Sequence, residues 1–255
     1  MGRNIINREK EENYNSFGSL MVIVRYRHSK DLDIYFPEYN WTYYNAAYKE
    51  FKNGHVKCPF EPRYFGVGYL GEGEFKTTDD DGNELRSIIT WSGMLQRCYG
   101  RYSEINKPSY EDCEVCAEWL NYQNFAKWYY ENYYEIPGER MMLDKDILIK
   151  GNKLYSPDTC VFVPIKINSL FTKCDKTRGE LPIGVSYYNK KFIAQCHDGN
   201  GNNKKIGRYS TIEQAFDAYK TYKEKIIKRI ADNYKKYIPV KLYKAMYDYN
   251  VEMDD

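Results

Sequence analysis

The sequence predicts an α+β protein built from three parts. A small β-rich domain is expected at residues 1–78, a helix-rich central domain at 84–174, and a three-stranded antiparallel sheet packed on one helix at 181–238. Three observations predict this class: short runs of alternating polar and apolar residues, segments with apolar residues three or four positions apart, and two polar linkers, TTDDDGNE and KCDKTRGELP. A terminal helix and an acidic tail are expected at 239–255.

The N-terminal domain is predicted from two strand-like runs. SLMVIVRYRHS and DLDIYF predict an antiparallel pair joined by a Ser-Lys-Asp turn. YYNAAYKEFKNGHVKCPFEP predicts a short amphipathic element that ends at Asn53-Gly54. The glycine-rich stretch GVGYLGEGEF lacks the Lys-Ser/Thr pair of a phosphate loop, so it predicts a turn-rich connector.

Two amphipathic helices are predicted in the central domain. ITWSGMLQRCYGRY places Trp91, Met94 and Leu95 on one stripe, and CAEWLNYQNFAKWYYENYY places Trp119 and Phe125 on another. Core packing is the preferred interpretation of these aromatic side chains, with base stacking as the alternative.

Composition and cysteine spacing limit the class of protein. No apolar run approaches the ~20 residues that cross a bilayer, and the N-terminus lacks an apolar signal segment, which predicts a cytoplasmic protein without a membrane partner. Seven cysteines predict thiols rather than a disulfide framework. Cys113 and Cys116 have the spacing of a zinc knuckle, but Cys160 and Cys174 lie fourteen positions apart, so thiols are favoured over Zn²⁺.

The C-terminal domain is predicted to be basic. Residues 183–239 contain twelve Lys and Arg against five Asp and Glu, a net +7, whereas the whole chain carries +2. A localised basic module is typical of a phosphate-backbone binder, and a solvated helix face is the alternative. Alternation over Lys191–His197 and the turn DGNGNN predict a hairpin, and Ser210 or Thr211 is expected to cap the helix that follows.

The same segment resembles the ethylene-response-factor (Apetala-two) type of DNA-binding domain. Its landmarks stand here as Gly184-Val185, Phe192-Ile193-Ala194, Gly207-Arg208-Tyr209 and the run from Thr211 to Tyr219. In that family the sheet enters the major groove of double-stranded DNA. The resemblance therefore nominates six DNA-contacting residues: Tyr188, Lys190, Gln195, His197, Lys205 and Arg208.

From Ile88 onward the chain resembles the phage-borne HNH homing-endonuclease group, whose members often end in an Apetala-two-like domain. The shared landmarks are Trp91-x-x-Met94-x-x-Arg97-Cys98-Tyr99, Cys116-x-x-Trp119, an acidic region, and Tyr155-Ser156-Pro157 followed by Cys160. The resemblance implies a ββα-metal type of central domain and a protein that works in the cytoplasm of a bacterial host.

An HNH nuclease holds one divalent metal ion between a β-hairpin and a helix, and a histidine activates water. The resemblance assigns the ligands of Mg²⁺ or Mn²⁺ to Asp144, Asp146 and Asn168. Lys145 occupies the position of the histidine, so the catalytic candidates are Asp144, Lys145 and Asp146. Thr159 stands where an orienting asparagine is expected.

These two departures leave alternatives open. Lys145 would act as a base only in its neutral form, which two neighbouring aspartates oppose. Asp144 and Asp146 can equally be turn-forming acids paired with a cation, and Asn152 a turn residue; the cations considered are Lys145, Lys150 and Arg140. The expected function is a phage or mobile-element DNA-binding protein that cleaves phosphodiesters with a metal. The alternative is a catalytically inactive phage factor that binds DNA, or that binds and inhibits a host protein such as a defence protein.

Overall fold

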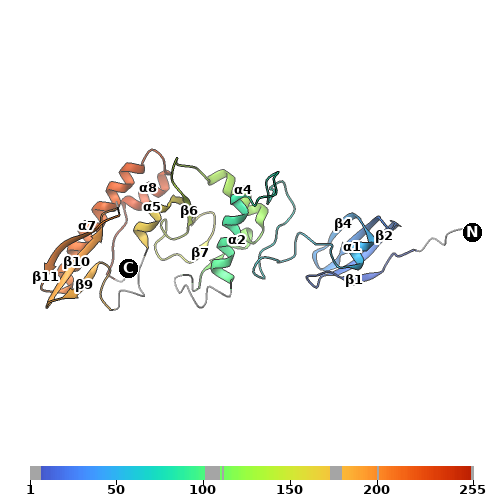
Figure 1. The fold of residues 1–255 in the computed structure, drawn as a ribbon, viewed down its shortest axis with the longest axis horizontal. Helices are drawn as coiled ribbons and strands as arrows, with labels where there is room; N and C mark the ends of the chain where they lie inside the picture. Colours follow the sequence, from blue (N-terminus) through green and yellow to red (C-terminus); the bar gives the residue numbers. More distant parts are fainter. Residues whose placement is uncertain (1–6, 101–109, 111, 173–179, 200, 254–255) are drawn as a thin grey trace, which may run out of the picture. The chain divides into compact units, whose positions relative to one another are not determined.

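The computed structural model of this chain describes residues 7–100, 110, 112–172, 180–199 and 201–253. The chain forms two compact units, Met1–Glu131 and Asn132–Asp255 (Figure 1). The predicted α+β class is confirmed, with an N-terminal antiparallel sheet, middle helices, and a C-terminal three-stranded antiparallel sheet packed on a helix.

The first unit opens with a four-stranded antiparallel sheet in the order β1-β2-β3-β4. The strands are β1 (Glu12–Tyr14), β2 (Leu20–His28), β3 (Asp31–Phe36) and β4 (Trp41–Ala46). The two predicted strands are β2 and β3, whereas β1 and β4 were not predicted. A short 3-10 turn, η1 (Pro37–Tyr39), joins β3 to β4, and α1 (Tyr48–Lys52) follows the sheet. The fully buried core of this sheet includes Met21, Ile23, Leu32, Ile34, Phe36 and Phe51.

Two amphipathic helices form the middle of the chain, as predicted. They are α2 (Arg86–Tyr99) and α4 (Tyr122–Asn132), with β5 (Glu114–Val115) and η3 (Ala117–Leu120) between them in sequence. Trp91 is fully buried, and its Nε1–H donates to the carbonyl of Trp119 at 2.6 Å. Core packing is therefore the role of these aromatic side chains.

The glycine-rich segment GVGYLGEGEF is fixed against the middle helices. The amide of Gln123 accepts from the N–H of Phe75 at 3.0 Å and donates to the Phe75 carbonyl at 3.1 Å. The N–H of Tyr69 donates to the carbonyl of Leu120 at 2.9 Å. A side chain at Gly73 would collide with Gln123, so glycine allows the close approach of this segment to α4.

The second unit contains two strand groups and three helices that matter for the site. Strands β6 (Met141–Asp144) and β8 (Val161–Pro164) pair antiparallel, with β7 (Leu154–Tyr155) between them in sequence. After β8 come α5 (Ile165–Asn168) and η4 (Ser169–Phe171). The C-terminal sheet, in the order β11-β10-β9, is made of β9 (Val185–Tyr188), β10 (Lys191–His197) and β11 (Asn203–Tyr209). The last helices are α7 (Ile212–Tyr234) and α8 (Val240–Tyr247).

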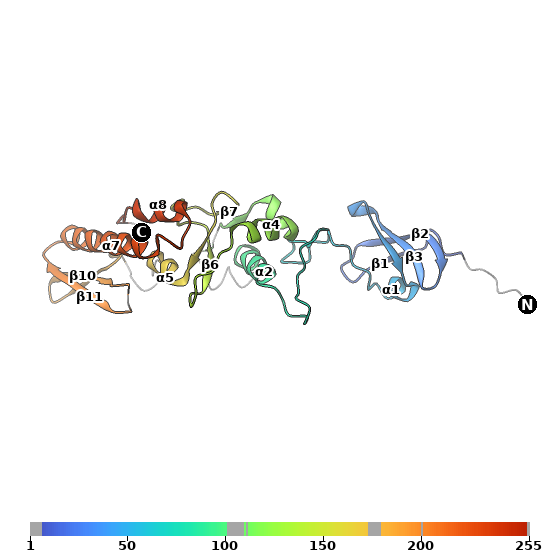
Figure 2. The ribbon, with the colours of Figure 1, turned by 90° about the horizontal axis from the view of Figure 1, so that it is seen from above.

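Helix α7 packs between the C-terminal sheet and α8, which lie on opposite sides of it (Figure 2). Thr211 caps this helix, accepting from the N–H of Gln214 at 3.3 Å, as predicted. The predicted hairpin turn is also present, closed by a hydrogen bond from the N–H of Asp198 to the carbonyl of Asn202 at 2.9 Å.

One hydrophobic core joins the β6–β8 pair to the C-terminal sheet. Its members come from β8, α5, β9, β10, α7 and α8 and include Val163, Ile167, Val185, Ala194, Ile227 and Leu242. The boundary predicted between 174 and 181 therefore separates two segments that share a core. Both segments are needed to bury it.

The segment after α8 folds back onto the same unit. Lys150 pairs with Glu252 at 2.6 Å, and Lys220 donates to the side-chain oxygen of Asn250 at 2.6 Å. Val251 is 3% exposed, and its N–H donates to Glu224 at 3.0 Å. The predicted acidic tail thus begins as an anchored segment.

Replacing Gly184 with alanine should destabilise the second unit more than the same change at Gly138. Both glycines have a left-handed φ, +75° and +78°, which costs an L-residue about 1–2 kcal/mol. A Cβ at Gly184 would also overlap the ring of Tyr219, whereas one at Gly138 meets nothing within 4 Å. Urea unfolding should show an additional loss of about 1–3 kcal/mol for Gly184→Ala. Equal losses for the two variants would contradict the close contact.

Candidate functional site

The first candidate site lies at the end of strand β6. In the antiparallel β6–β8 pair, Met141 is opposite Pro164 and Asp144 is opposite Val161. Helix α5 follows β8 directly and contacts both strands, and the N–H of Ile165 donates to the carbonyl of Arg140 at 2.8 Å. The segment therefore has a strand, a long loop, a second strand and a short helix, in that order. The loop between the strands, residues 145–160, is called the β6–β8 loop below.

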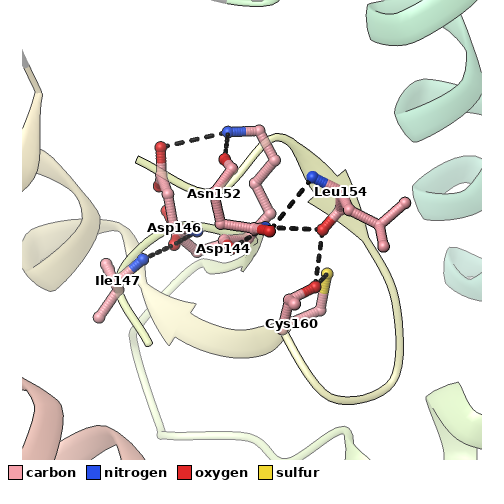
Figure 3. Close-up of polar contacts among 8 residues, drawn as sticks. Asp144, Asp146, Ile147, Asn152, Leu154 and Cys160 are labelled. Atoms are coloured by element: carbon pink, nitrogen blue, oxygen red, sulfur yellow. Dashed lines mark hydrogen bonds and ion pairs between the residues drawn. The ribbon is translucent and has the colours of Figure 1, made fainter. Parts of the chain in front are cut away.

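Asp144 begins the β6–β8 loop by holding its first turn. Its Oδ1 accepts from the N–H of Asp146 at 3.0 Å and from the N–H of Ile147 at 2.8 Å (Figure 3). Burial, with a smaller contribution from the nearby charge of Asp146, raises the pKa of Asp144 to about 6. Asp144 thus has the turn-forming role that was the alternative to metal binding. A divalent cation beside these two carboxylates would relieve their repulsion.

Lys145 points into the loop and is only 6% exposed. Its Nζ donates to the carbonyl of Asn152 at 2.9 Å and pairs with Asp146 Oδ2 at 3.2 Å. The ring of Tyr155 lies beneath the ammonium, with 5.9 Å between Nζ and the ring centroid. These contacts use the N–H bonds of the ammonium group, so the geometry gives Lys145 a role in holding the loop.

Asn152 fixes the other side of the same loop. Its Nδ2 donates to the carbonyls of Lys145 and Leu154, both at 2.7 Å, and its Oδ1 accepts from the N–H of Leu154 at 3.3 Å (Figure 3). Lys145 and Asn152 therefore bind each other reciprocally, each side chain to the other's carbonyl. The Gly-Asn context in the sequence predicts only a turn at Asn152.

Thr159 closes the far end of the loop. Its hydroxyl donates to the carbonyl of Leu154 at 2.7 Å and accepts from the N–H of Ser156 at 3.1 Å. Thr159, which stands where an asparagine is expected, is 9% exposed, and its hydroxyl is bonded to backbone groups of the loop. Its structural role is to keep the SPDTC turn closed.

Asn168, the third predicted metal ligand, lies at the end of α5 and is partly exposed. Helix α5 packs on β6, the strand that ends in Asp144. Among the residues that the structure describes, no three His, Cys, Asp or Glu side chains gather where they could hold a metal ion. Asp144 and Asp146 offer carboxylate oxygens, the type of ligand through which Mg²⁺ binds while it keeps several waters.

Cys113 and Cys116 are free thiols in the structure. Cys113 is buried and Cys116 is half-buried, and burial raises the pKa of the Cys116 thiol. A thiol shifted in this direction keeps its proton at neutral pH unless a metal displaces it. Cys174 lies outside the described residues.

The second candidate site is the outer face of the C-terminal sheet, the side that points away from α7. All six predicted DNA-contacting residues are exposed. Gln195 is opposite Lys205, and Arg208 is opposite Ile193, so these side chains share one face across β10 and β11. His197 follows on the same face of β10. This face, defined by Tyr188, Lys191, Gln195, His197, Lys205 and Arg208, is called the sheet face below.

Lys190 lies beyond the strands, at the tip of the β9–β10 hairpin. Asn189 and Lys190 both adopt left-handed conformations, with φ of 50° and 58°, as a two-residue I′ turn requires. The structure adds Lys191, which is opposite Tyr188 and donates to the hydroxyl of Ser210 at 3.1 Å. Alternation from Lys191 to His197 is the sequence signal that could have placed Lys191 on this face.

Comparison with known proteins adds no family to these observations. No protein-family model, curated protein or solved structure matches the chain. Among the described residues, no helix is long and apolar enough to cross a membrane.

Replacing Asp144 with asparagine should change how stability depends on pH. Between about pH 4 and pH 6 the folded protein keeps the proton on Asp144 that the unfolded chain releases, so the free energy of unfolding falls as the pH rises. The substituted amide cannot titrate, and it keeps an oxygen acceptor for the two N–H groups. Asp144→Asn should therefore raise the free energy of unfolding at pH 7 by about 1–3 kcal/mol and leave it unchanged near pH 4.

Urea unfolding at both pH values measures this effect. The matched control is Asp158→Asn, a change at an exposed carboxylate of the same loop. A difference between wild type and Asp144→Asn that stays constant with pH would show that the Asp144 carboxyl is not perturbed.

Proposed function

We propose that this protein binds double-stranded DNA through the sheet face. The observation that carries the proposal is a group of exposed amide and cationic side chains on adjacent strands, with Gln195 opposite Lys205 and Arg208 beside them. The resemblance to the Apetala-two type of domain supports the same face.

The dimensions of the sheet suit the major groove. Adjacent strands are about 4.8 Å apart, so three strands span about 10 Å, and the groove of B-DNA is about 12 Å wide. Side chains in the middle of the sheet would meet base edges, and those at its rim would meet phosphates. Gln195, on the central strand β10, is suited to a bidentate contact with adenine, and the cations at the rim, Lys190, Lys205 and Arg208, to phosphates.

A second function, metal-dependent phosphodiester cleavage, is proposed for the β6–β8 loop. The observation that favours it is the pair of neighbouring carboxylates, Asp144 and Asp146, of which Asp144 has a pKa raised to about 6. Mg²⁺ or Mn²⁺ bound there would supply Lewis-acid stabilisation of charge on a phosphate. The protein's own residues hold the loop, with Lys145 and Asn152 fixing its two sides.

The alternative to cleavage is a catalytically inactive factor that binds DNA or a host protein. The contacts of Lys145 and Thr159 support it, because both side chains at positions expected to serve catalysis are bound to loop carbonyls. On this alternative the β6–β8 loop is a structural element of a DNA-binding protein.

Lys205→Ala should weaken binding to duplex DNA, whereas Lys204→Ala should not. These neighbouring lysines lie on opposite faces of β11, because Lys205 is opposite the exposed Gln195 and Lys204 is opposite the buried Cys196. Lys204 Nζ lies 5.1 Å from the ring centroid of Tyr222. Loss of one phosphate contact lowers the slope of log K against log salt by about 0.9. Fluorescence anisotropy over a salt series measures this slope. Equal effects of the two changes would argue against the sheet face.

Plasmid nicking tests the second function. The substrate is plasmid DNA that carries the sequence flanking the protein's own gene, incubated with Mg²⁺ or Mn²⁺. Nicking that disappears in Asp144→Ala and Asp146→Ala, and persists in Asp158→Ala, is expected of a metal site in the β6–β8 loop. Salt-sensitive DNA binding without nicking by the wild type would leave the inactive factor as the function.

A further inference from the structure

The helix side of the second unit carries a second group of cations, separate from the sheet face. The half of α7 nearest its N-terminus exposes two acids, Glu213 and Asp217, whereas the half nearest its C-terminus and the two residues that follow it expose five cations and one acid, Asp232. Together with one lysine of α8 these cations form a surface called the helix face: Lys225, Lys228, Arg229, Lys235, Lys236 and Lys244, all exposed.

Within the described part of the chain, no carboxylate pairs with the five lysines of the helix face, whereas Arg229 donates to the carbonyl of Asp198 at 2.6 Å. The acid on the same stretch of α7, Asp232, accepts a hydrogen bond from the hydroxyl of Tyr243 at 2.9 Å. A concentration of unpaired positive charge on one helix side favours a polyanion as the occupant.

Two aromatic rings of α8 hold part of the helix face in place. Lys228 Nζ lies 5.4 Å from the ring centroid of Tyr247, and Lys235 Nζ lies 5.1 Å from that of Tyr243. The two rings are themselves 5.5 Å apart. Lys228 and Lys235 are thereby held where α7 packs against α8. This lowers the conformational entropy that these two side chains lose when they bind a ligand.

The length of the helix face matches a nucleic-acid backbone. Lys225 and Lys236 are eleven residues apart, along α7 and the turn that ends it, which corresponds to about 16 Å at about 1.5 Å per residue. Phosphates along one strand of B-DNA repeat about every 3.4 Å of helix axis, so the helix face covers about five of them.

A duplex on the sheet face cannot also reach the helix face. The buried side chains of α7, among them Ala215, Phe216 and Ile226, lie between the two surfaces. A helix is about 10–12 Å across, and the sheet adds to that thickness. We infer that the helix face binds the phosphate backbone of a second DNA segment, so that one chain holds two duplexes. This goes beyond binding by the sheet face.

The test counts duplexes bound per chain, with short duplex DNA of random sequence as the probe. The helix-face variant is Lys225→Gln/Lys236→Gln/Lys244→Gln, which spares the two lysines that contact tyrosine rings. The charge-matched control is Lys10→Gln/Lys52→Gln/Lys57→Gln, at exposed lysines of the first unit. The sheet-face variant is Lys205→Ala/Arg208→Ala.

Analytical ultracentrifugation with labelled DNA should find two duplexes per wild-type chain and per control chain, and one per helix-face variant chain. Any second duplex that the helix-face variant still binds should show a salt slope smaller by up to about 2.7. One duplex per wild-type chain, bound unchanged by the helix-face variant, would overturn the inference. One duplex that is lost in the helix-face variant and kept in the sheet-face variant would support binding by the helix face and overturn binding by the sheet face. No binding by the wild type would overturn both.

Discussion

Burial of the apolar side chains of α7 is the interaction on which the second unit depends. Ile226, Ile227 and Ile230 are each less than 5% exposed, and burying such a side chain contributes about 1.5–3 kcal/mol. The same core takes in the inner side of the C-terminal sheet and the β8–α5 segment. Both candidate sites are therefore positioned by one helix. A loss of packing at α7 would disturb the sheet and the β6–β8 loop together.

The two candidate sites are rigid for different reasons. On the sheet face, backbone hydrogen bonds between strands fix where each side chain emerges, while the side chains extend into solvent. In the β6–β8 loop, side chains hold the backbone, because Asp144, Asn152 and Thr159 bind loop N–H and carbonyl groups. The first arrangement suits adaptable contacts with a large ligand. The second suits a fixed geometry around a small one.

Local patterns predicted the elements whose periodicity is strong. Strands β2, β3, β10 and β11 and helices α2, α4 and α7 were all predicted from alternation or helical spacing. Strand β4 was missed because its sequence, WTYYNA, has two successive tyrosines and so does not alternate between apolar and polar residues. Both tyrosines are exposed in the structure. Strand β1 has three residues, too few for a pattern.

The contacts of the candidate sites were harder to predict because they depend on chain closure. Lys145 and Asn152 bind each other's carbonyls only when the loop folds back on itself. The spacing of residues in the sequence does not predict this pair of contacts. The shared core was also missed. A polar linker such as KCDKTRGELP predicts a solvated segment. It does not predict which apolar residues on its two sides pack together.

The missing side chain at Gly184 sets how deeply strand β9 can settle onto α7. The ring of Tyr219 fills the volume that any larger residue at this position would need. The strand that leads to the Asn189-Lys190 turn is thus held at the distance that an aromatic ring imposes. Any substitution at position 184 adds a side chain that would overlap this ring, because every other residue is larger than glycine. A smaller side chain at position 219 would free this volume, so the two positions are coupled through packing.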